Sequence, residues 1–531
     1  MQKIEINSFF SDVLTVYKLL KKIKKIKFFF FVLLLILSST FIDAFLITKL
    51  ADLNDLSQIS EILLLLIGFR FLIMFLSLYL SISFSYDVFK KMCTLALDNL
   101  ISFEEYSKVV TDRDSYTRII NADILMVSRG YILQFVNIIT DSLTLSFITF
   151  ALLIGYEIEY VVIFATIIFL FGFLQFLLSL FTQKTGKIRS TYDRERFNVS
   201  REALQMIDTL VVTRTKGFFI NKFREALYNF AKSLKLSTFI IQSSRLQLEL
   251  FIVIIFILSV TVFTFVNQNF TEGMFAALGF AFLRVIPAFS RISASFQQLS
   301  FSKAALKSVY PIILKKDEIS ENSEYENFEF LDINLVQQDK KVRSLIKIKK
   351  GKKYVISGPS GSGKSSFLKS ILGLKEQYIS EEKLQCIPSL ENFKIAYVPQ
   401  DINLFNSDLF ENVTLKSKNI CSQDELLLFD GLIIDLGLNN LEKEQILGTD
   451  AAKLSGGERQ RLSIARALFQ RPDILFMDEF SSALDNESAY KVLKTCKEIC
   501  STIIYISHDA SMIKEADFEI RLKTHNQYEI I

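Results

Sequence analysis

Apolar and polar segments alternate over the first 315 residues, and the apolar ones have the length of membrane spans. Six runs of about 20 residues lie at about 28–48, 62–84, 131–155, 159–182, 246–266 and 273–295. Of the whole chain, 50% is hydrophobic, and the mean hydropathy is +0.32, as expected for a membrane protein. The pattern therefore predicts an all-α transmembrane domain of six spans over residues 1–315.

Two long polar stretches separate the second span from the third and the fourth span from the fifth. Both contain few Gly or Pro residues and repeat apolar residues at helical spacing, as in "EALQMIDTL" and "FREALYNFAKSL". This spacing predicts long helical extensions that project beyond the membrane.

Basic residues orient the predicted spans. The three short loops, 49–61, 156–158 and 267–272, contain one basic residue, Lys49, whereas the N-terminal segment and the two long stretches are rich in Lys and Arg. Cytoplasmic loops of membrane proteins carry such an excess. We therefore expect an integral membrane protein with cytoplasmic N- and C-termini. Because the basic residues follow this topology, no nucleic-acid partner is expected.

The pattern changes at residues 316–327, a polar and acidic stretch that we interpret as a linker. From residue 328 to residue 531, short apolar runs such as "KYVISG", "IAYVPQ", "ILFMD" and "TIIYIS" alternate with helical segments. This alternation predicts an α/β domain with a parallel sheet that helices cover on both faces. The five cysteines form no metal-binding motif and are expected to be reduced thiols.

A glycine-rich segment in the second half fits the phosphate-loop pattern G-x-x-x-x-G-K-[ST]. It follows the apolar run "YVIS" and precedes the helical segment "SFLKSILGL", which is the context that this motif requires. Its backbone N–H groups would surround the phosphates, Lys364 would reach the outer two, and the Ser365 hydroxyl would bind Mg²⁺. The expected ATP-binding residues here are Gly358, Pro359, Ser360, Gly361, Ser362, Gly363, Lys364, Ser365 and Ser366.

Two further motifs accompany this loop. The run "ILFMDE" ends in Asp478 and Glu479, where one carboxylate can hold Mg²⁺ and the next can orient or deprotonate an attacking water. The segment "LSGGERQRL" opens a helix with a serine and two glycines, and such a helix start favours anion binding. Its expected ATP-binding residues are Ser455, Gly456, Gly457 and Glu458.

With these motifs the chain resembles the ATP-binding cassette (ABC) transporters, and the resemblance covers its whole length: six spans followed by one nucleotide-binding domain. It implies a P-loop ATPase domain of ABC type that hydrolyses ATP with Mg²⁺. In this family the signature helix of one domain completes the ATP site of a second domain. One cassette per chain therefore implies a homodimer that holds two ATP molecules at its interface.

Other residues match motifs of this family. Gln400 in "YVPQ" resembles the glutamine that senses Mg²⁺ and ATP, and Asp485 ends "SALD", which resembles the loop that crosses the dimer. His508 in "ISHD" resembles the switch histidine that contacts the γ-phosphate. The resemblance implies catalytic roles for Glu479, His508 and Gln400, and it implies that Mg²⁺ is held by Ser365, Gln400 and Asp478.

The chain departs from the family pattern in two places. Gln337 stands where related proteins usually have the aromatic residue that stacks on adenine, and no aromatic residue occurs between Phe330 and Tyr354. Gly448-Thr449-Asp450 stands where exporters tend to have Gly-Glu. The two long cytoplasmic loops are typical of exporters, and the architecture of the family implies coupling turns near Glu105–Arg118 and Asp208–Gly217.

Four arginines lie within or beside the predicted spans. At 1.5 Å per residue, Arg70 and Arg284 lie about 12 and 17 Å from the outer face, a depth at which a charge needs a water-filled cavity or an anionic partner. Arg291 and Arg245 lie near the inner boundary, where they either line the same cavity or reach lipid headgroups. Asp43 is the one acidic partner that we expect within the spans. The arginines thus predict a positively charged cavity for phosphate, pyrophosphate or carboxylate.

The segment "FLRVIPAFSRISASFQQLS" also resembles the flippases of lipid-linked oligosaccharides. This implies a glycan on a polyprenyl pyrophosphate as the cargo, in a bacterial inner (cell) membrane. Two alternatives stay open: an exporter of the same architecture for another lipid, a peptide or a drug, and a membrane ATPase that regulates without moving cargo.

Overall fold

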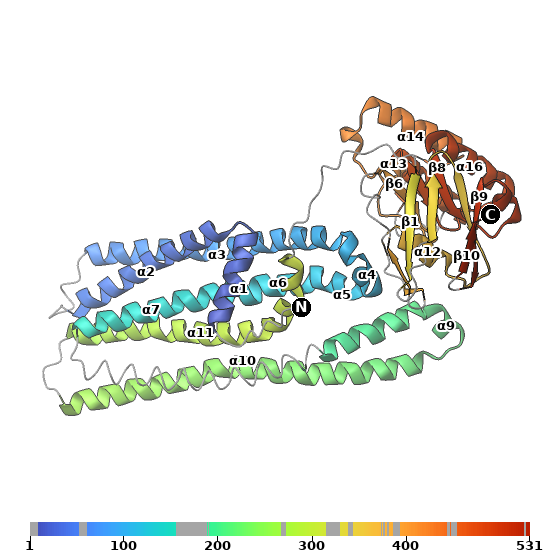
Figure 1. The fold of residues 1–531 in the computed structure, drawn as a ribbon. Coiled ribbons are helices and arrows are strands. Elements are labelled where there is room, and N and C mark those ends of the chain that lie inside the picture. Colours follow the sequence, from blue (N-terminus) through green and yellow to red (C-terminus); the bar gives the residue numbers. More distant parts are fainter. Residues whose placement is uncertain are drawn as a thin grey trace. The chain divides into compact units, whose positions relative to one another are not determined.

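The computed structural model describes residues 9–51, 61–155, 188, 191–266, 272–314, 330–337, 344–372, 374, 378–379, 382–385, 393–442, 446–447, 454–524 and 527–530. The chain divides into two compact units (Figure 1). The first consists of Met1–Ser102 and Thr111–Lys316, and the second consists of Phe103–Val110 and Asp317–Ile531.

Long helices build the first unit, and the helical segment Phe103–Val110 between them belongs to the second unit. In chain order the helical elements up to residue 316 are α1 (Phe9–Lys22), α2 (Ile26–Ala51), α3 (Glu61–Leu100), α4 (Phe103–Thr111), α5 (Arg113–Arg118), the π-helical turn η2 (Ile119–Asp123), α6 (Ile124–Val127), the π-helical turn η3 (Ser128–Ile132), α7 (Leu133–Gly155), α9 (Ile207–Val212), α10 (Lys216–Val266) and α11 (Glu272–Ile313). Helices cover the first, second, third, fifth and sixth predicted spans, whereas the fourth, 159–182, lies outside the described residues.

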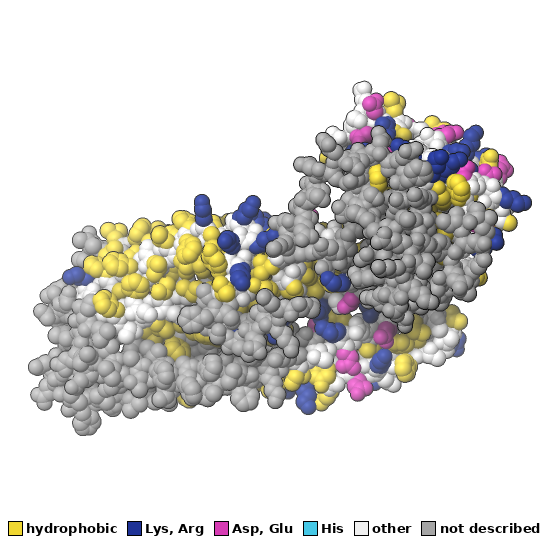
Figure 2. Space-filling view, in the orientation of Figure 1, with side chains coloured by type: hydrophobic (Ala, Val, Ile, Leu, Met, Phe, Trp, Pro, Cys, Tyr) yellow, Lys and Arg dark blue, Asp and Glu magenta, His cyan; other side chains and the backbone are white. Residues whose placement is uncertain are grey.

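The helices α2, α3, α7 and α11 lie along one another in this unit (Figure 1). Among the described residues, three stretches are long and apolar enough to cross a membrane: Ile26–Lys49, Leu65–Leu100 and Arg113–Ala151. The outer face of α3 exposes Phe69, Phe71, Leu72 and Phe75, and Figure 2 shows hydrophobic side chains gathered over this part of the molecule. Such a continuous apolar surface is what a lipid environment would cover.

Strands and shorter helices build the second unit. The strands are β1 (Phe330–Gln337), β2 (Ser344–Lys349), β3 (Lys353–Ser357), β4 (Tyr378–Ile379), β5 (Glu382–Gln385), β6 (Ile395–Val398), β7 (Ile474–Met477), β8 (Thr502–Ile506), β9 (Phe518–Thr524) and β10 (Gln527–Ile530). The helices are α12 (Lys364–Ile371), α13 (Leu409–Thr414), the 3₁₀ turn η5 (Lys418–Ile420), α14 (Gln423–Asp435), α15 (Gly456–Phe469), α16 (Asn486–Ile499) and α17 (Ala510–Lys514).

The main sheet has the strand order β10-β9-β3-β8-β7-β6. Its strands from β9 to β6 are parallel, and β10 pairs with β9 in the antiparallel direction. The predicted fold class, an all-α membrane domain followed by a parallel α/β ATPase domain, is confirmed. A second, antiparallel sheet with the order β2-β1-β5-β4 was not predicted from the sequence.

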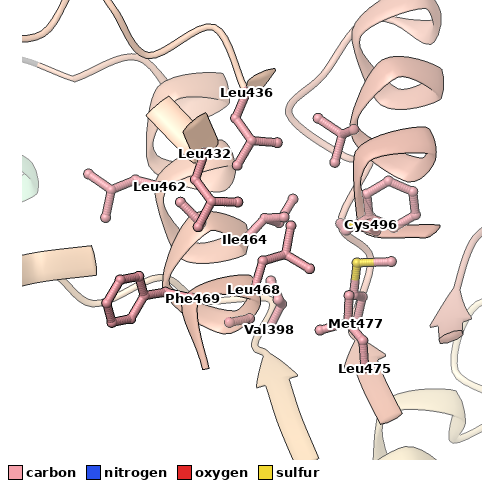
Figure 3. Packing of buried hydrophobic residues seen from close by; sticks show 14 of the residues in the cluster. Val398, Leu432, Leu436, Leu462, Ile464, Leu468, Phe469, Leu475, Met477 and Cys496 are labelled. Atoms are coloured by element: carbon pink, nitrogen blue, oxygen red, sulfur yellow. The ribbon is translucent and has the colours of Figure 1, made fainter. Parts of the chain in front are cut away.

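Alternate residues of the main sheet enter two separate cores. Leu475 and Met477 belong to a cluster that includes residues of α15 and α16, whereas Ile474 and Phe476 belong to a cluster that includes α12. Figure 3 shows Leu475 and Met477 among residues of the first of these clusters. Successive strand residues point to opposite faces, so both faces of β7 are buried and no polar face is left.

Four of the cysteines are described. Cys93, Cys421, Cys496 and Cys500 are free thiols, as predicted, and Cys496 and Cys500 are buried. Within the described part of the chain, His, Cys, Asp and Glu residues form no group that could hold a metal ion by themselves.

Candidate functional site

The phosphate loop connects β3 to α12 by a backbone that only glycine adopts easily. Gly358, Gly361 and Gly363 have φ values of +144°, +81° and +90°, in the left-handed region that is unfavourable for other residues. The glycines turn the loop so that the helix N-terminus follows it directly, with Gly363 as the N-cap of α12. This arrangement presents backbone N–H groups to an anion.

Lys364 is the first residue of α12 and is 5% exposed. Its Nζ donates hydrogen bonds to the carbonyl oxygens of Gly358, at 3.1 Å, and Pro359, at 3.0 Å. The ammonium group therefore lies inside the curve of the loop, where a phosphate would be bound. Burial lowers the pKa of Lys364, while the nearby carboxylates of Glu479 and Asp478 act in the opposite direction.

Ser365 and Asp478 form the expected Mg²⁺ side of the site. The Ser365 Oγ donates to Oδ1 of Asp478 at 2.9 Å, and Asp478, immediately after β7, is fully buried. Burial raises the pKa of Asp478. Its Oδ2 is also buried and has no hydrogen-bond partner in the described part of the chain. A hydroxyl and a carboxylate with an unsatisfied oxygen are the ligands that suit Mg²⁺.

Three strand ends bring the predicted catalytic residues together. Gln400 follows β6, Glu479 follows β7 and His508 follows β8, so parallel strands deliver them to one edge of the sheet. The Gln400 Nε2 donates to Oε2 of Glu479 at 2.8 Å, and the His508 Nε2 lies 3.5 Å from Oε1 of Glu479. The Glu479 carboxylate is therefore held between an amide and an imidazole.

Glu479 also has an unusual backbone conformation, with φ at +51°. A non-glycine residue in this region costs about 1–2 kcal/mol. Such strain persists where the surrounding structure fixes it, and it concentrates at functional sites. The left-handed turn bends the chain away from the strand directly after Asp478. The adjacent carboxylates of Asp478 and Glu479 can therefore point to different places in the site.

The signature segment is built as a capped helix start. Ser455 is the N-cap of α15 and forms a capping box with Glu458, whose carboxylate accepts from the Ser455 backbone N–H at 2.8 Å. This hydrogen bond is the main reason that the pKa of Glu458 is lowered. A Cβ added to Gly457 would lie 3.1 Å from the carbonyl oxygen of Ala483. The glycines thus let the segment lie close to the turn before Asp485.

Asp485 is the N-cap of α16, and its Oδ2 accepts from the Ser488 backbone N–H at 3.1 Å. In the described part of the chain, the side-chain hydrogen bonds of Ser455, Glu458 and Asp485 stay within their own helix starts, and Gly457 lies against the turn between them. Within one chain they organise these helix starts.

Arg466 is a residue of this site that the sequence analysis missed. It lies near the end of α15, and its Nε donates to the carbonyl oxygen of Asn412 at 2.7 Å. A terminal nitrogen donates to the carbonyl oxygen of Asn403 at 3.1 Å. Asn412 is fully buried and donates in turn to the carbonyl oxygen of Phe405 at 3.0 Å. Arg466 therefore fixes the segment that follows Gln400 against the signature helix.

The signal for Arg466 was present in the sequence as an arginine among the buried apolar positions of α15, beside Ala465 and Ala467. We expect Arg466→Lys to lower the free energy of unfolding by about 1–3 kcal/mol, because a lysine cannot reproduce a directed set of charged hydrogen bonds. Thermal unfolding of the full chain in detergent would measure this. Arg471→Lys, the same change at an exposed position just after α15, should shift stability by less than about 0.5 kcal/mol. Equal losses in the two variants would contradict the role of Arg466.

In the first unit, Asp43 lies between two of the four arginines. The Arg70 Nε is 2.5 Å from Oδ1 of Asp43, and an Arg70 terminal nitrogen donates to Oδ2 at 2.9 Å. The Arg284 Nε is 3.3 Å from Oδ1 of the same carboxylate. The partner that the sequence analysis named is therefore present, and it is shared.

Arg291 has a partner that the sequence analysis overlooked. Its Nε and a terminal nitrogen both reach the Asp141 carboxylate, the latter at 2.7 Å. Asp141 lies inside the third predicted span, so the expectation that Asp43 is the one acid in the spans was wrong. Because Asp141 neutralises Arg291, the described arginines that we assigned to a cavity carry less positive charge than we expected.

Several other predicted residues cannot be described in full. Gln337 ends β1, but its side chain lies outside the described part of the structure, as do the side chain of Arg245 and the whole of Gly448-Thr449-Asp450. The two expected coupling turns are described. The first, Glu105–Arg118, spans parts of α4 and α5, and the second, Asp208–Gly217, contains most of α9.

The comparisons with known proteins agree with these motifs. Residues 343–482 match the family model described as "ABC transporter". The chain is 28% identical over 289 residues to an "ATP-dependent lipid A-core flippase" of Pasteurella multocida, covering 50% of this chain and 49% of that protein. It is 35% identical over 179 residues to the "Iron-sulfur clusters transporter ATM1, mitochondrial" of Kluyveromyces lactis, covering 32% and 25%. The chain thus spans about half or less of the length of these curated relatives.

A solved structure is similar over nearly the whole chain. It is described as "Structure of a bacterial Atm1-family ABC exporter with ATP bound", and it aligns with a TM-score of 0.69 at 16% identity, covering 96% of this chain and 94% of that one. At this identity the similarity shows the fold.

Proposed function

We propose that this chain, an ABC exporter half-transporter by its fold and its ATPase domain, works as a homodimer that uses ATP hydrolysis to move an anionic lipid-linked glycan across a membrane. The observation that carries the proposal is the meeting of Gln400, Glu479 and His508 at the sheet edge. The same chain contains helices long and apolar enough to span a membrane.

The arrangement supports in-line hydrolysis of ATP. Lys364 and the loop N–H groups would bind the outer phosphates, and Ser365, Asp478 and Gln400 would hold Mg²⁺, which would neutralise charge on the phosphates. Glu479 would orient the attacking water and accept its proton, with its carboxylate positioned by Gln400. His508 would contact the γ-phosphate from the other side of Glu479.

Two features support a homodimer. Ser455, Gly456 and Asp485 are exposed, and among the described residues the hydrogen bonds of Ser455 and Asp485 stay within their own helices, which suits a role toward a second copy. The tip that includes α9 also exposes Val211, at 69%, and Val212, at 81%, and an apolar tip of this kind needs a surface to cover it. A second copy would bring its own bound ATP to the signature segment, and it would provide a surface that covers the apolar tip.

Arg284 supports an anionic cargo, because it is a partly exposed guanidinium inside an apolar helical bundle. The relatives named above are described as transporting different molecules, a lipid A-core and iron–sulfur clusters, so export of another cargo is the alternative.

We also propose that the protein lies in the bacterial inner membrane with both termini in the cytoplasm. We propose domains at residues 1–315 and 328–531, joined by a linker at 316–327.

Reconstituted vesicles test the function. The full chain would be incorporated into liposomes with a labelled polyprenyl-pyrophosphate oligosaccharide, and cargo on each leaflet would be measured with and without ATP. We expect ATP-dependent movement that Glu479→Gln abolishes. ATP hydrolysis that no lipid stimulates and that moves no label would contradict transport and favour a regulatory ATPase. Movement of a neutral lipid instead would favour the alternative cargo.

A further inference from the structure

Two ion clusters join helices of the first unit, and their charges are balanced differently. The Asp43 cluster is mostly buried, whereas 47% of the Arg291 side chain in the second cluster is exposed. In the Asp43 cluster, Arg70 of α3 and Arg284 of α11 share the Asp43 carboxylate of α2. In the Asp141 pair, Arg291 of α11 meets Asp141 of α7. One carboxylate neutralises one arginine in the pair. In the cluster two arginines share one carboxylate, so among the described residues one positive charge is left over.

The two arginines of the Asp43 cluster are bound unequally. Arg70 contacts both carboxylate oxygens, at 2.5 and 2.9 Å, and its residue exposure is 7%. Arg284 reaches a single oxygen at 3.3 Å through its Nε, and 25% of its side chain is exposed. Asp43 itself is 2% exposed. A two-point, buried contact is the stronger one, so the surplus charge belongs to Arg284.

Arg284 keeps its recognition groups accessible. Its guanidinium lies 5.0 Å from the ring centroid of Phe280, and within the described part of the chain its terminal nitrogens make no hydrogen bond. These two nitrogens form the edge that binds phosphate or carboxylate in bidentate fashion. Because the Nε contact is loose and the described residues make no hydrogen bond to this edge, an anion can bind there while the carboxylate is still near.

We propose that Asp43 is the resident counter-ion of the cargo site: it holds Arg70 permanently and releases Arg284 to the pyrophosphate group of the cargo. This rests on the proposed function and assigns different roles to the two arginines. Arg284 binds the cargo, and Arg70 is a positioning residue that acts through Asp43. When the cargo leaves, Arg284 returns to Asp43, so an arginine is not left unpaired at membrane depth, where a lone charge is costly.

Binding of a defined probe to the full chain in lipid nanodiscs tests the inference. Farnesyl pyrophosphate is the probe, farnesol is its uncharged counterpart, and inorganic pyrophosphate shows whether the lipid is required. We expect Arg284→Met to weaken farnesyl pyrophosphate binding at least tenfold. The double variant Arg70→Met with Asp43→Asn removes the tight pair as a neutral unit and should bind as well as the unmodified chain or more tightly. Arg129→Met, at an exposed arginine over the Tyr86 ring, is the matched control and should change nothing.

The outcomes separate the inference from the proposed function. If the unmodified chain binds the probe and the double variant loses binding as Arg284→Met does, then Arg70 is a direct ligand and the inference is overturned while the cargo class stands. If the unmodified chain binds neither pyrophosphate, both are overturned. Equal binding of both pyrophosphates supports the role of Arg284 with a free anion as ligand, and preference for farnesyl pyrophosphate supports a lipid.

One single variant guards against loss of folding. Asp43→Asn keeps the shape and one acceptor but removes the competing charge, so we expect several-fold tighter binding of farnesyl pyrophosphate. Unchanged affinity in this variant would overturn the inference even if the double variant fails to fold.

Discussion

Glu479→Gln is expected to lower the rate of ATP hydrolysis by about 10²–10⁴-fold while ATP binding is kept. The substitution preserves the shape of the side chain, and an amide oxygen can still accept the hydrogen bond that Gln400 donates at 2.8 Å. It also leaves the left-handed backbone at φ +51° with a side chain of the same branching. The main loss is the negative charge and the ability to accept a proton from water. Phosphate release and binding of a fluorescent ATP analogue would measure the two quantities separately.

Glu487→Gln is the matched control for this variant. Glu487 lies on α16 and forms an exposed pair with Lys491, with 77% of its side chain accessible. Exposed pairs of this kind contribute little, so hydrolysis should stay within about twofold of the unmodified chain. If both Glu479→Gln and Glu487→Gln kept most of the ATP hydrolysis rate, Glu479 would not be the proton acceptor.

Local patterns explain why candidate residues of an ATP site could be named from the sequence. A phosphate loop is one continuous segment, and Lys364 and Ser365 follow from its fixed spacing. Gln400, Glu479 and His508 each follow an apolar strand, and parallel strands bring their carboxyl ends to one edge. The predicted parallel sheet and the family resemblance together indicated that these side chains would lie close to one another.

Contacts between distant helices were harder to predict. Arg466 binds the backbone of Asn412, 54 residues away, and a backbone carbonyl has no sequence signature. Asp141 and Arg291 form an ion pair although 150 residues separate them in the sequence. Predicting this pair would require knowing which face of α7 carries Asp141 and which helix lies against that face. Both residues are charged groups at otherwise apolar positions, and that mismatch is the signal that could have singled them out.

The pairing of charges changes how the membrane arginines should be interpreted. A sequence shows that an arginine lies in a span, but the free charge depends on which carboxylate reaches it and by how many contacts. Asp141 takes Arg291, and Asp43 takes Arg70 more strongly than Arg284. Of the three described arginines, Arg284 is therefore the one whose charge is least well matched by the described carboxylates, which is why we propose it as the anion ligand.

Gly358→Ala is expected to weaken ATP binding by more than about 30-fold, which corresponds to about 2 kcal/mol. A Cβ at this position would lie 2.4 Å from the carbonyl oxygen of Leu522, whose strand β9 pairs with β3 and cannot give way. The φ of +144° adds backbone strain, so the loop must shift away from its phosphate-binding shape. Gly361→Ala is the matched control, because Gly361 also has a positive φ, +81°, but no described residue beyond its chain neighbours lies within 4 Å of its Cβ position. It carries strain of about 1–2 kcal/mol alone, so it should weaken binding by about 5- to 30-fold, less than Gly358→Ala does. Titration of a fluorescent ATP analogue against the full chain would rank the two variants, and equal losses would show that close approach to Leu522 does not shape the loop.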